Sequence, residues 1–249
     1  MLLGFVHGVM NTDNTTISGE TIDYGPCAFI DAYEPAAVFS SIDHAGRYAY
    51  GNQPAIGLWN LTRFAETLLP LLDEDPGRAK AGALDALERF SEEYERAWAD
   101  GFAAKLGIAG EGEADAGSVS RIATGLLDDL GTYRLDFTGA FRALGRAARG
   151  DDGTWDALFA RTGGKPGGWF ADWKALSPDA DAMDRVNPIV IPRNHLVDEA
   201  LDAATDGDPA PFERLLDAVS HPYDERPGFE RYAAPAPPGS GPFVSYCGT

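Results

Sequence analysis

The sequence predicts a mainly helical protein of the α+β class, with short strands confined to its amino-terminal part. Residues 4–50 are dense in glycine, asparagine, aspartate, serine and proline, which is typical of loops and short strands. From Ile56 onward, apolar residues recur at helical spacing. The chain has 249 residues, of which 44% are hydrophobic, so it is long enough to bury a sizeable core.

The first half of the chain divides into a loop region and two expected helices. The β-branched stretches 15–17 and 21–22 are the expected short strands. The first helix is expected to begin near Trp59 or Asn60 and to end before Pro76, with apolar residues at Leu58, Leu61, Ala65, Leu68, Leu69 and Leu72. A longer amphipathic helix is expected to include residues 84–102 and to end before the glycine-rich segment 107–117.

The second half continues the helical pattern. Further helices are expected at about residues 118–130, 137–148, 154–161 and 169–176. Segment 187–192 is expected to be extended, because each proline disfavours helix at the residue before it. Asn194 is expected to cap a helix carrying residues 197–204, and a last helix is expected over 211–219. After His221 a proline- and glycine-rich tail is expected to lie over the surface without a core of its own.

Charge and composition exclude several functional classes. The chain has 39 acidic and 20 basic residues, a net charge of −19, which would repel phosphate backbones and anionic membranes. We therefore expect neither nucleic acid nor a membrane as a partner. No run approaches the roughly 20 apolar residues of a membrane helix, and no basic leader is present, so we expect a cytoplasmic protein. The two cysteines exclude a disulfide framework.

Two short motifs near the start contain the residues best suited to chemistry. HGVMNTDN at 7–14 is followed by DYGP at 23–26. Mg²⁺ prefers hard oxygen ligands, usually one or two protein groups together with phosphates and water. Asn14 and Asp23 offer such oxygens, and Asp13 is then available to orient or deprotonate an attacking hydroxyl, as in the catalytic loop and D-F-G motif of kinases. Asparagine and aspartate are also the commonest turn residues, so the spacing alone leaves both interpretations open.

Longer stretches of the sequence resemble a known family. GFVHGVMNTDN at 4–14, ISGETIDYGPCAF at 17–29 and VFSSIDHAGRYAYGNQP at 38–54 are similar to the selenoprotein O (SelO/YdiU) family. Shorter similar stretches lie at 59–61, 65–70, 187–188, 191–195 and 247–249. Between about residues 75 and 165 the likeness is only that of generic helices.

The resemblance implies a protein-kinase-like fold that transfers AMP from ATP to hydroxyl side chains of proteins. Position by position, Asp13 matches the family's proton acceptor, and Asn14 and Asp23 match its magnesium ligands. Asp23 also matches a residue beside the bound nucleotide. The implied cofactor is Mg²⁺, with Mn²⁺ as the alternative, and the implied substrates are ATP and the Ser, Thr or Tyr hydroxyls of proteins.

The resemblance covers only the carboxyl-terminal half of such proteins. The half that holds the glycine-rich nucleotide loop, the phosphate-binding lysine and the arginines for AMP transfer is expected to be absent. Residues 1–220 are then expected to form the helical lobe, with the catalytic and metal loop at 7–26, and residues 221–249 its surface tail. A gene fragment, a misassigned start and a split enzyme with a separately encoded amino-terminal half remain open. A non-catalytic helical interaction module and a phosphoryl-transferring enzyme remain the alternative functions.

Other polar residues in this region have simpler expected roles. His7 and His44 are expected to be hydrogen-bonded structural histidines, because neither has a second His or Cys at metal spacing. Asp43 and Arg47 are expected to form a surface ion pair. The resemblance places cysteines at both 27 and 247. Two alternatives stay open: a disulfide between Cys27 and Cys247, which would hold the tail near the loop, and two free thiols.

Overall fold

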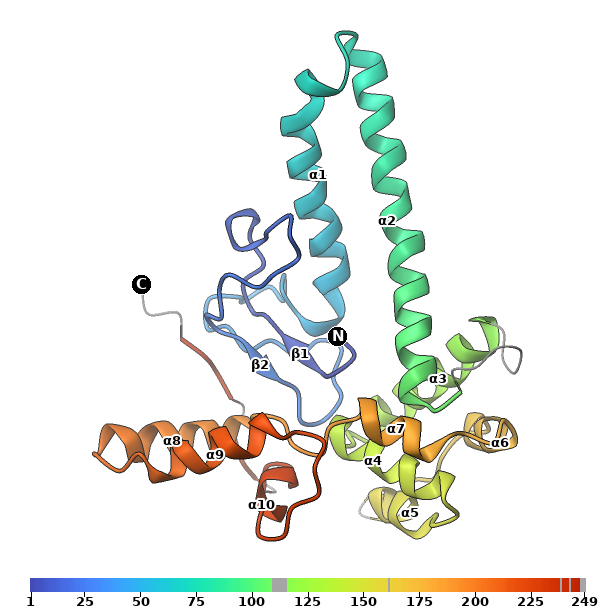
Figure 1. Ribbon diagram of the computed structural model, residues 1–249, viewed down its shortest axis with the longest axis vertical. Coiled ribbons are helices and arrows are strands. Elements are labelled where there is room, and N and C mark those ends of the chain that lie inside the picture. The colour runs from blue at the N-terminus through green and yellow to red at the C-terminus, as the bar shows by residue number, and fades with distance from the viewer. Residues whose placement is uncertain (109–115, 161, 238, 242, 247–249) are drawn as a thin grey trace. The chain divides into compact units, whose positions relative to one another are not determined.

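The computed structural model describes residues 1–108, 116–160, 162–237, 239–241 and 243–246 (Figure 1). It is mainly helical, with one two-stranded sheet, in agreement with the predicted class. The chain forms two compact units. Unit 1 comprises residues 1–5, 28–34 and 99–243, and unit 2 comprises residues 6–27, 35–98 and 244–249. No helix within the described ranges is long and apolar enough to cross a membrane.

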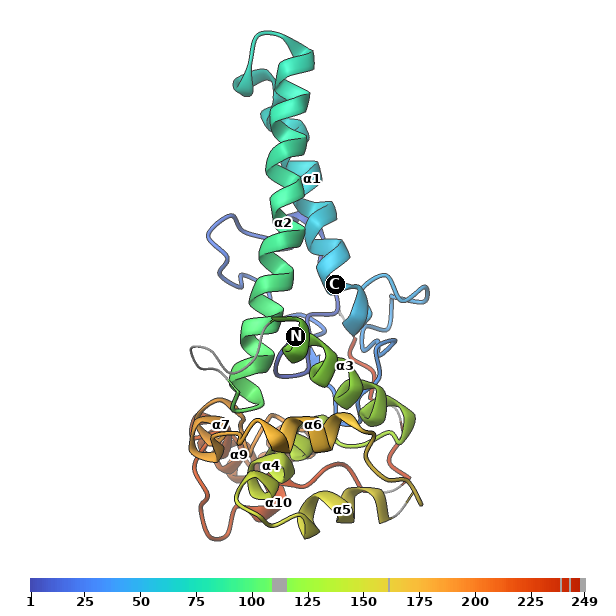
Figure 2. The ribbon, with the colours of Figure 1, turned by 90° about the vertical axis from the view of Figure 1, so that its right-hand side faces the viewer.

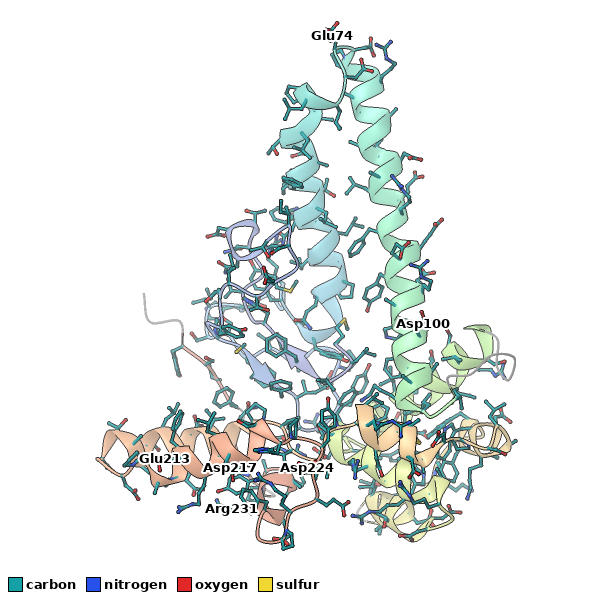
Figure 3. All side chains as sticks on the ribbon, in the orientation of Figure 1. Glu74, Asp100, Glu213, Asp217, Asp224 and Arg231 are labelled. Carbon is teal, nitrogen blue, oxygen red and sulfur yellow. The ribbon has the colours of Figure 1, made fainter. Side chains whose placement is uncertain are left out.

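Unit 2 consists of loops and a helical hairpin. Two short 3-10 turns, η1 (Thr12–Asn14) and η2 (Tyr50–Asn52), precede helix α1 (Gln53–Leu72). The longer helix α2 (Pro76–Lys105) returns antiparallel to α1, and its residues up to Trp98 belong to this unit (Figures 1 and 2). The turn between the helices is acidic, with Glu74 at its tip (Figure 3). Asp75 accepts a hydrogen bond from the backbone N–H of Arg78 and so caps α2, whose first residue is a proline.

Unit 1 contains the remaining helices and most of the sheet. Strands β1 (Phe5–Val6) and β2 (Ala28–Phe29) pair with each other. The helices are α3 (Ala116–Thr132), α4 (Phe137–Ala148), α5 (Gly153–Ala160), α6 (Trp169–Ala175), α7 (Ala180–Val186), α8 (Asn194–Thr205), α9 (Ala210–Ser220) and α10 (Glu230–Ala233). Helix α4 packs on α5 and α7, α3 packs on α6, and α8 lies beside α9. The core of this unit is apolar and aromatic; its fully buried members include Phe102, Leu126, Phe137, Phe141, Trp155 and Trp173.

The strands do not lie where the β-branched residues predicted them. Residues 15–17 and 21–22 are irregular, and Ile17 is 85% exposed. The hydroxyls of Thr15 and Thr16 donate to the nearby carbonyls of Asn11 and Glu20 instead. Such local hydrogen bonds from side chains compete with the backbone hydrogen bonds of a strand. The β-branched residues at 15–17 therefore do not form the predicted strand.

Several helix boundaries also differ from the predicted ones. Helix α1 begins at Gln53, so Asn60 lies inside the helix and not at its start. Asn194 is the first residue of α8 and not its cap, and its side-chain amide donates to the carbonyl of Phe29. Helix α7, which the sequence analysis did not predict, is capped by Asp179 through two backbone N–H groups.

One residue of the carboxyl-terminal tail packs into a core cluster formed by other segments of unit 1. Tyr232, in the short helix α10, is only 7% exposed. It packs in a cluster with Val190 and with residues of α8 and α9, which are Leu196, Ala200, Leu215 and Ala218. The proline and glycine content of the tail did not reveal this buried aromatic residue.

A buried arginine joins four segments of unit 1. The guanidinium group of Arg193 is inaccessible to solvent and donates to Asp31 at 2.6 Å, to both carboxylate oxygens of Asp136 and to the carbonyl of Ala233. Burial by itself would lower the pKa of Arg193, but the hydrogen bonds and charges of Asp136 and Asp31 outweigh it and raise that pKa. Asp136 also caps α4 by accepting from the N–H of Gly139.

A buried lysine forms a second polar contact in unit 1. Lys105 is 4% exposed, and its ammonium group donates to Oδ1 of Asn187 at 2.7 Å, while the amide of Asn187 donates back to the carbonyl of Lys105. The ammonium nitrogen lies 3.7 Å from the centre of the Phe141 ring. Burial lowers the pKa of Lys105 to about 7. Burial also lowers the pKa of the Met1 amino group, with a further contribution from the charge of Lys105.

Substitution of Arg193 should destabilise unit 1 strongly. Arg193→Met leaves Asp31 and Asp136 without their cation, and we expect a loss of about 3–5 kcal/mol in the free energy of unfolding. Arg193→Lys keeps the charge but not the two-pronged contact, and we expect an intermediate loss. Urea denaturation followed by circular dichroism measures both. The exposed Arg89→Met is the matched control, and equal midpoints for Arg193→Met and the control would contradict the assigned role.

The buried Lys105 predicts a pH dependence of stability. Because its pKa is about 7 when folded and near 10.5 when unfolded, the unfolded chain binds more protons between these values, and the free energy of unfolding rises with pH across that window. The slope contributed by this one group is at most about 1.4 kcal/mol per pH unit. We expect Lys105→Met to remove this slope and the exposed Lys80→Met to keep it, as measured by urea denaturation at pH 7, 8 and 9. Parallel pH profiles for the two variants would show that Lys105 is not the titrating group.

Candidate active site

The candidate site is the segment from His7 to Cys27 in unit 2, together with the start of α1 that supports it. His7 forms the first link. Its backbone N–H donates to the side chain of Gln53 at 3.1 Å, and its Nδ1 accepts from the N–H of Val9 at 3.4 Å. Nε2 must then carry the proton, and it donates to the carbonyl oxygen of Asp23 at 2.8 Å. The expected structural role of His7 is confirmed by these hydrogen bonds.

The residue after His7 shows how closely the two halves of the segment approach. Gly8 has a φ of +87°, and a Cβ atom at this position would lie 2.7 Å from the carbonyl oxygen of Pro26. Only glycine fits both this conformation and this spacing. The HG and DYGP motifs, separate in the sequence, are therefore in direct contact.

Val9 connects this contact to the second motif. Its carbonyl accepts from Nδ2 of Asn14 at 3.0 Å, while its N–H is bonded to His7. The hydrogen bonds thus run from Asp23 through His7 and Val9 to Asn14. Since a carbonyl can only accept, the nitrogen of the Asn14 amide faces Val9 and its oxygen remains available to another partner.

The three predicted site residues have different surroundings. Asp13 is exposed in the turn η1, and its carboxylate has no hydrogen bond or ion pair to any described residue. Asp23 is half-buried, and one of its carboxylate oxygens accepts from the N–H of Gly25 at 3.0 Å, which shapes the DYG turn. Asp13, Asn14 and Asp23 therefore each keep at least one oxygen that no described residue occupies.

Helix α1 and the segment before it hold the loop through side-chain hydrogen bonds. The amide of Asn60, which is 4% exposed, donates to the carbonyl of Met10 and to the hydroxyl of Thr15, both at 3.0 Å. The Tyr48 hydroxyl donates to the side chain of Asn11. Both ends of the turn that carries Asp13 are fixed in this way, and Val9 of the same loop packs in an apolar cluster with Tyr48 and Ile56.

The supporting roles of these residues are not predicted from the sequence. Asn60 is expected there only at the start of a helix and within the family-like stretch 59–61, and Tyr48 and Gln53 stand only within the family-like stretch 38–54. The helical spacing contains a signal for Asn60, because it lies four residues after the apolar Ile56 and therefore on the same face of the helix. Buried polar side chains are almost always hydrogen-bonded, so such a position indicates a fixed partner.

The expected ion pair between Asp43 and Arg47 is wrong. Asp43 accepts from the backbone N–H groups of Arg47 and Tyr48 and so closes a turn. The guanidinium group of Arg47 lies over the ring of Trp59, 4.6 Å from its centre. The carboxylate of Asp43 is occupied by two backbone N–H groups of this turn, and Arg47 packs on an aromatic ring instead of pairing with Asp43.

Cys27 is half-buried at the end of the segment, and its thiol donates to the carbonyl of Tyr24. Burial, with a smaller contribution from the charge of Asp23, raises the pKa of Cys27, so the thiol stays protonated near neutral pH. Cys247 lies outside the described residues, and its pairing with Cys27 stays a prediction. Nearby Ser245 is described, and it pairs with residues 39–41 through two backbone hydrogen bonds.

The donor set fits a hard cation that also binds phosphate. Two carboxylates and one amide oxygen suit Mg²⁺ or Mn²⁺, and they leave room for phosphate and water ligands. The described residues contain no cluster of three or more His, Cys, Asp or Glu side chains, so no self-sufficient metal cage is seen there. Any ion held by these residues would therefore need further ligands from outside the described residues.

Comparison with known proteins shows the family of the chain. The family model for the protein adenylyltransferase SelO matches residues 1–220, and the chain belongs to that family. A protein nucleotidyltransferase YdiU of a Mycobacterium species (strain KMS) is 59% identical over the whole chain, which covers 51% of that protein. The YdiU proteins of Mycolicibacterium paratuberculosis and Cereibacter sphaeroides are 56% and 53% identical, again over the whole chain and 51% of their own length. The chain thus spans about half the length of these curated relatives.

Removal of the Asn60 amide should loosen the turn that carries Asp13. Asn60→Leu keeps the size of the side chain but leaves the Met10 carbonyl and the Thr15 hydroxyl without their donor, and we expect a loss of about 1–3 kcal/mol in stability. Amide hydrogen exchange should rise in residues 10–15. Asn52→Leu removes an exposed amide that donates to Gly46 in the same unit and serves as the control. Unchanged exchange in residues 10–15 of Asn60→Leu would contradict the supporting role.

Proposed function

We propose that this chain supplies the catalytic and metal-binding loop of a protein adenylyltransferase, which transfers AMP from ATP to Ser, Thr or Tyr hydroxyls of proteins. Membership of the SelO family supports this reaction class. The observation that carries the assignment is the hydrogen-bond path from Asp23 through His7 and Val9 to Asn14, which links the two metal-ligand candidates while leaving oxygens on both uncommitted. We also propose that the helical part is the corresponding lobe of a kinase-like fold.

The residues have distinct roles in this proposal. Asn14 and Asp23 hold Mg²⁺, or Mn²⁺ as the alternative, through their side-chain oxygens. When bound, the metal neutralises charge on the phosphates of ATP. Asp13, exposed and without a partner among the described residues, accepts the proton of the incoming hydroxyl.

The proposed AMP transfer needs no reactants other than ATP, the acceptor hydroxyl and a proton acceptor. The acceptor oxygen forms a bond to the α-phosphorus, the bond from that phosphorus to the bridging oxygen of the β-phosphate breaks, and pyrophosphate leaves. The hydroxyl proton passes to Asp13. His7 does not take part, because both of its ring nitrogens are engaged with the backbone, and it acts as a positioning residue for Asp23.

The proposed transfer of AMP requires more of the protein than this chain contains. Because the chain spans about half of its curated relatives, the remaining contacts to ATP are proposed to come from an amino-terminal half, either joined to this chain or encoded separately. The decisive experiment incubates the chain, alone and fused to the part of a curated relative that it lacks, with a protein acceptor and ATP labelled at the α- or the γ-phosphate. Label transferred only from the α-position supports adenylylation. Label only from the γ-position indicates phosphoryl transfer, and no label from the fusion favours a non-catalytic module.

Single substitutions in the fusion test the assigned roles. Asp13→Asn should lower the rate of AMP transfer by about 100-fold or more, because the proton acceptor is removed. Asp23→Asn and Asn14→Ala should lower it too, and higher Mg²⁺ or Mn²⁺ should partly restore Asn14→Ala. Glu20→Gln changes an exposed acid in the same loop and should leave the rate unchanged. Full activity of Asp13→Asn would rule out its role as the base.

A further inference from the structure

The part of unit 2 next to the candidate loop is unusually poor in carboxylates. Residues 44–65 contain Arg47 and Arg63 but no aspartate or glutamate, in a chain that has 39 acidic residues. It is the longest stretch in the sequence without an acidic residue. The acidic turn at residues 73–75, with Glu74 at its tip, lies at the other end of α1 (Figure 3).

The two arginines of this stretch share one aromatic ring. The guanidinium groups of Arg47 and Arg63 lie 4.6 Å and 5.5 Å from the centre of the Trp59 ring. Arg47 also lies 5.6 Å from the ring of Tyr48. Trp59 is 39% exposed although it is a large aromatic residue, so the two cations and the ring form an accessible surface, which we call the Arg–Trp surface.

The charges of this surface are not fully neutralised within the described chain. Arg47 is exposed, and no carboxylate of a described residue pairs with it, because Asp43 is engaged with backbone N–H groups. Arg63 pairs with Glu66 at 2.7 Å, but both side chains are largely exposed, and such pairs contribute only about 0–1 kcal/mol. Both guanidinium groups can therefore bind an external carboxylate.

The Arg–Trp surface adjoins the turn that carries Asp13. Tyr48, next to Arg47, bonds the side chain of Asn11, and Asn60, next to Trp59, bonds Met10 and Thr15. The residues that support the turn and the residues that form the surface are thus immediate neighbours in the chain. This adjacency is the structural basis for relating the surface to a peptide that would place a hydroxyl at Asp13.

We propose that Arg47, Trp59 and Arg63 form a docking site for the protein substrate and select acceptor hydroxyls that are flanked by acidic residues. This inference rests on the function proposed above and adds a substrate preference to it. Planar guanidinium groups bind carboxylates in two-pronged geometry, and their contact with Trp59 holds them in place. At physiological salt, charges further away than about 8 Å are screened, so the local arginines outweigh the net charge of −19.

A binding experiment tests the docking site independently of catalysis. Fluorescein-labelled peptides with one serine, flanked by glutamates, glutamines or lysines, are titrated with the full 249-residue chain, and fluorescence anisotropy gives the dissociation constants. We expect the glutamate peptide to bind about tenfold more tightly than the glutamine peptide. The preference should weaken as salt rises. Equal binding of the glutamate and glutamine peptides would overturn the proposal.

Variants locate the site and separate it from other anion sites. Arg47→Gln with Arg63→Gln should abolish the preference for glutamate, whereas Arg89→Gln, on α2 of the same unit, should preserve it. Circular dichroism verifies that the variants fold. Persistence of the preference in the double variant would overturn the proposal, as would displacement of the glutamate peptide by equimolar ATP or by single-stranded DNA, because either displacement would assign the surface to phosphates.

The two proposals fail in different ways. A lack of AMP transfer by the fused protein, together with retained preference for glutamate peptides, rejects the adenylyltransferase function but not the docking site. If AMP transfer occurs and glutamate-flanked acceptors are not modified faster than glutamine-flanked ones, the substrate preference is rejected and the reaction stands.

Discussion

The buried contact of Arg193 with Asp31 and Asp136 is the interaction on which unit 1 most depends. An arginine removed from water is tolerated only if anions and hydrogen-bond acceptors replace the solvent, and here two carboxylates and the Ala233 carbonyl do so. The partners come from the segment after β2, from the start of α4 and from the end of α10, while Arg193 itself precedes α8. One side chain therefore joins segments that are far apart in the sequence.

Unit 2 uses a different principle, because its candidate loop has little regular structure. The loop is held by bonds from the side chains of His7, Asn14 and Asn60 to backbone carbonyls, and by the bond from the Tyr48 hydroxyl to the side chain of Asn11. These bonds occupy the nitrogen of Asn14 and the ring of His7, but no described residue occupies the carboxylate of Asp13, the amide oxygen of Asn14 or the second carboxylate oxygen of Asp23. The loop is thereby positioned without using the oxygens that the proposed function assigns to metal binding and proton transfer, which is the condition for a preorganised site.

The sequence predicted the helical class and most helices, because apolar spacing records which face of each helix is buried. It failed where local chemistry competes with periodicity. Thr15 and Thr16 bond to nearby carbonyls and form no strand, and the capping side chain of Asp179 starts a helix too short to show a period. The candidate site residues were predicted from motif and resemblance, but the contacts that support them were not, because Asn60 and Tyr48 lie far from the loop in sequence and meet it only through folding.

The close approach of Gly8 to Pro26 has a consequence for how the loop tolerates change. Any side chain at position 8 would require both a strained backbone and a displacement of the Pro26 carbonyl, and this displacement would carry the neighbouring DYG turn with it. The close spacing of residue 8 and Pro26 thus depends on glycine at position 8, which has no Cβ atom. Even alanine, the smallest side chain that could be introduced at position 8, would disturb the contact between the two halves of the loop without touching Asp13 or Asp23.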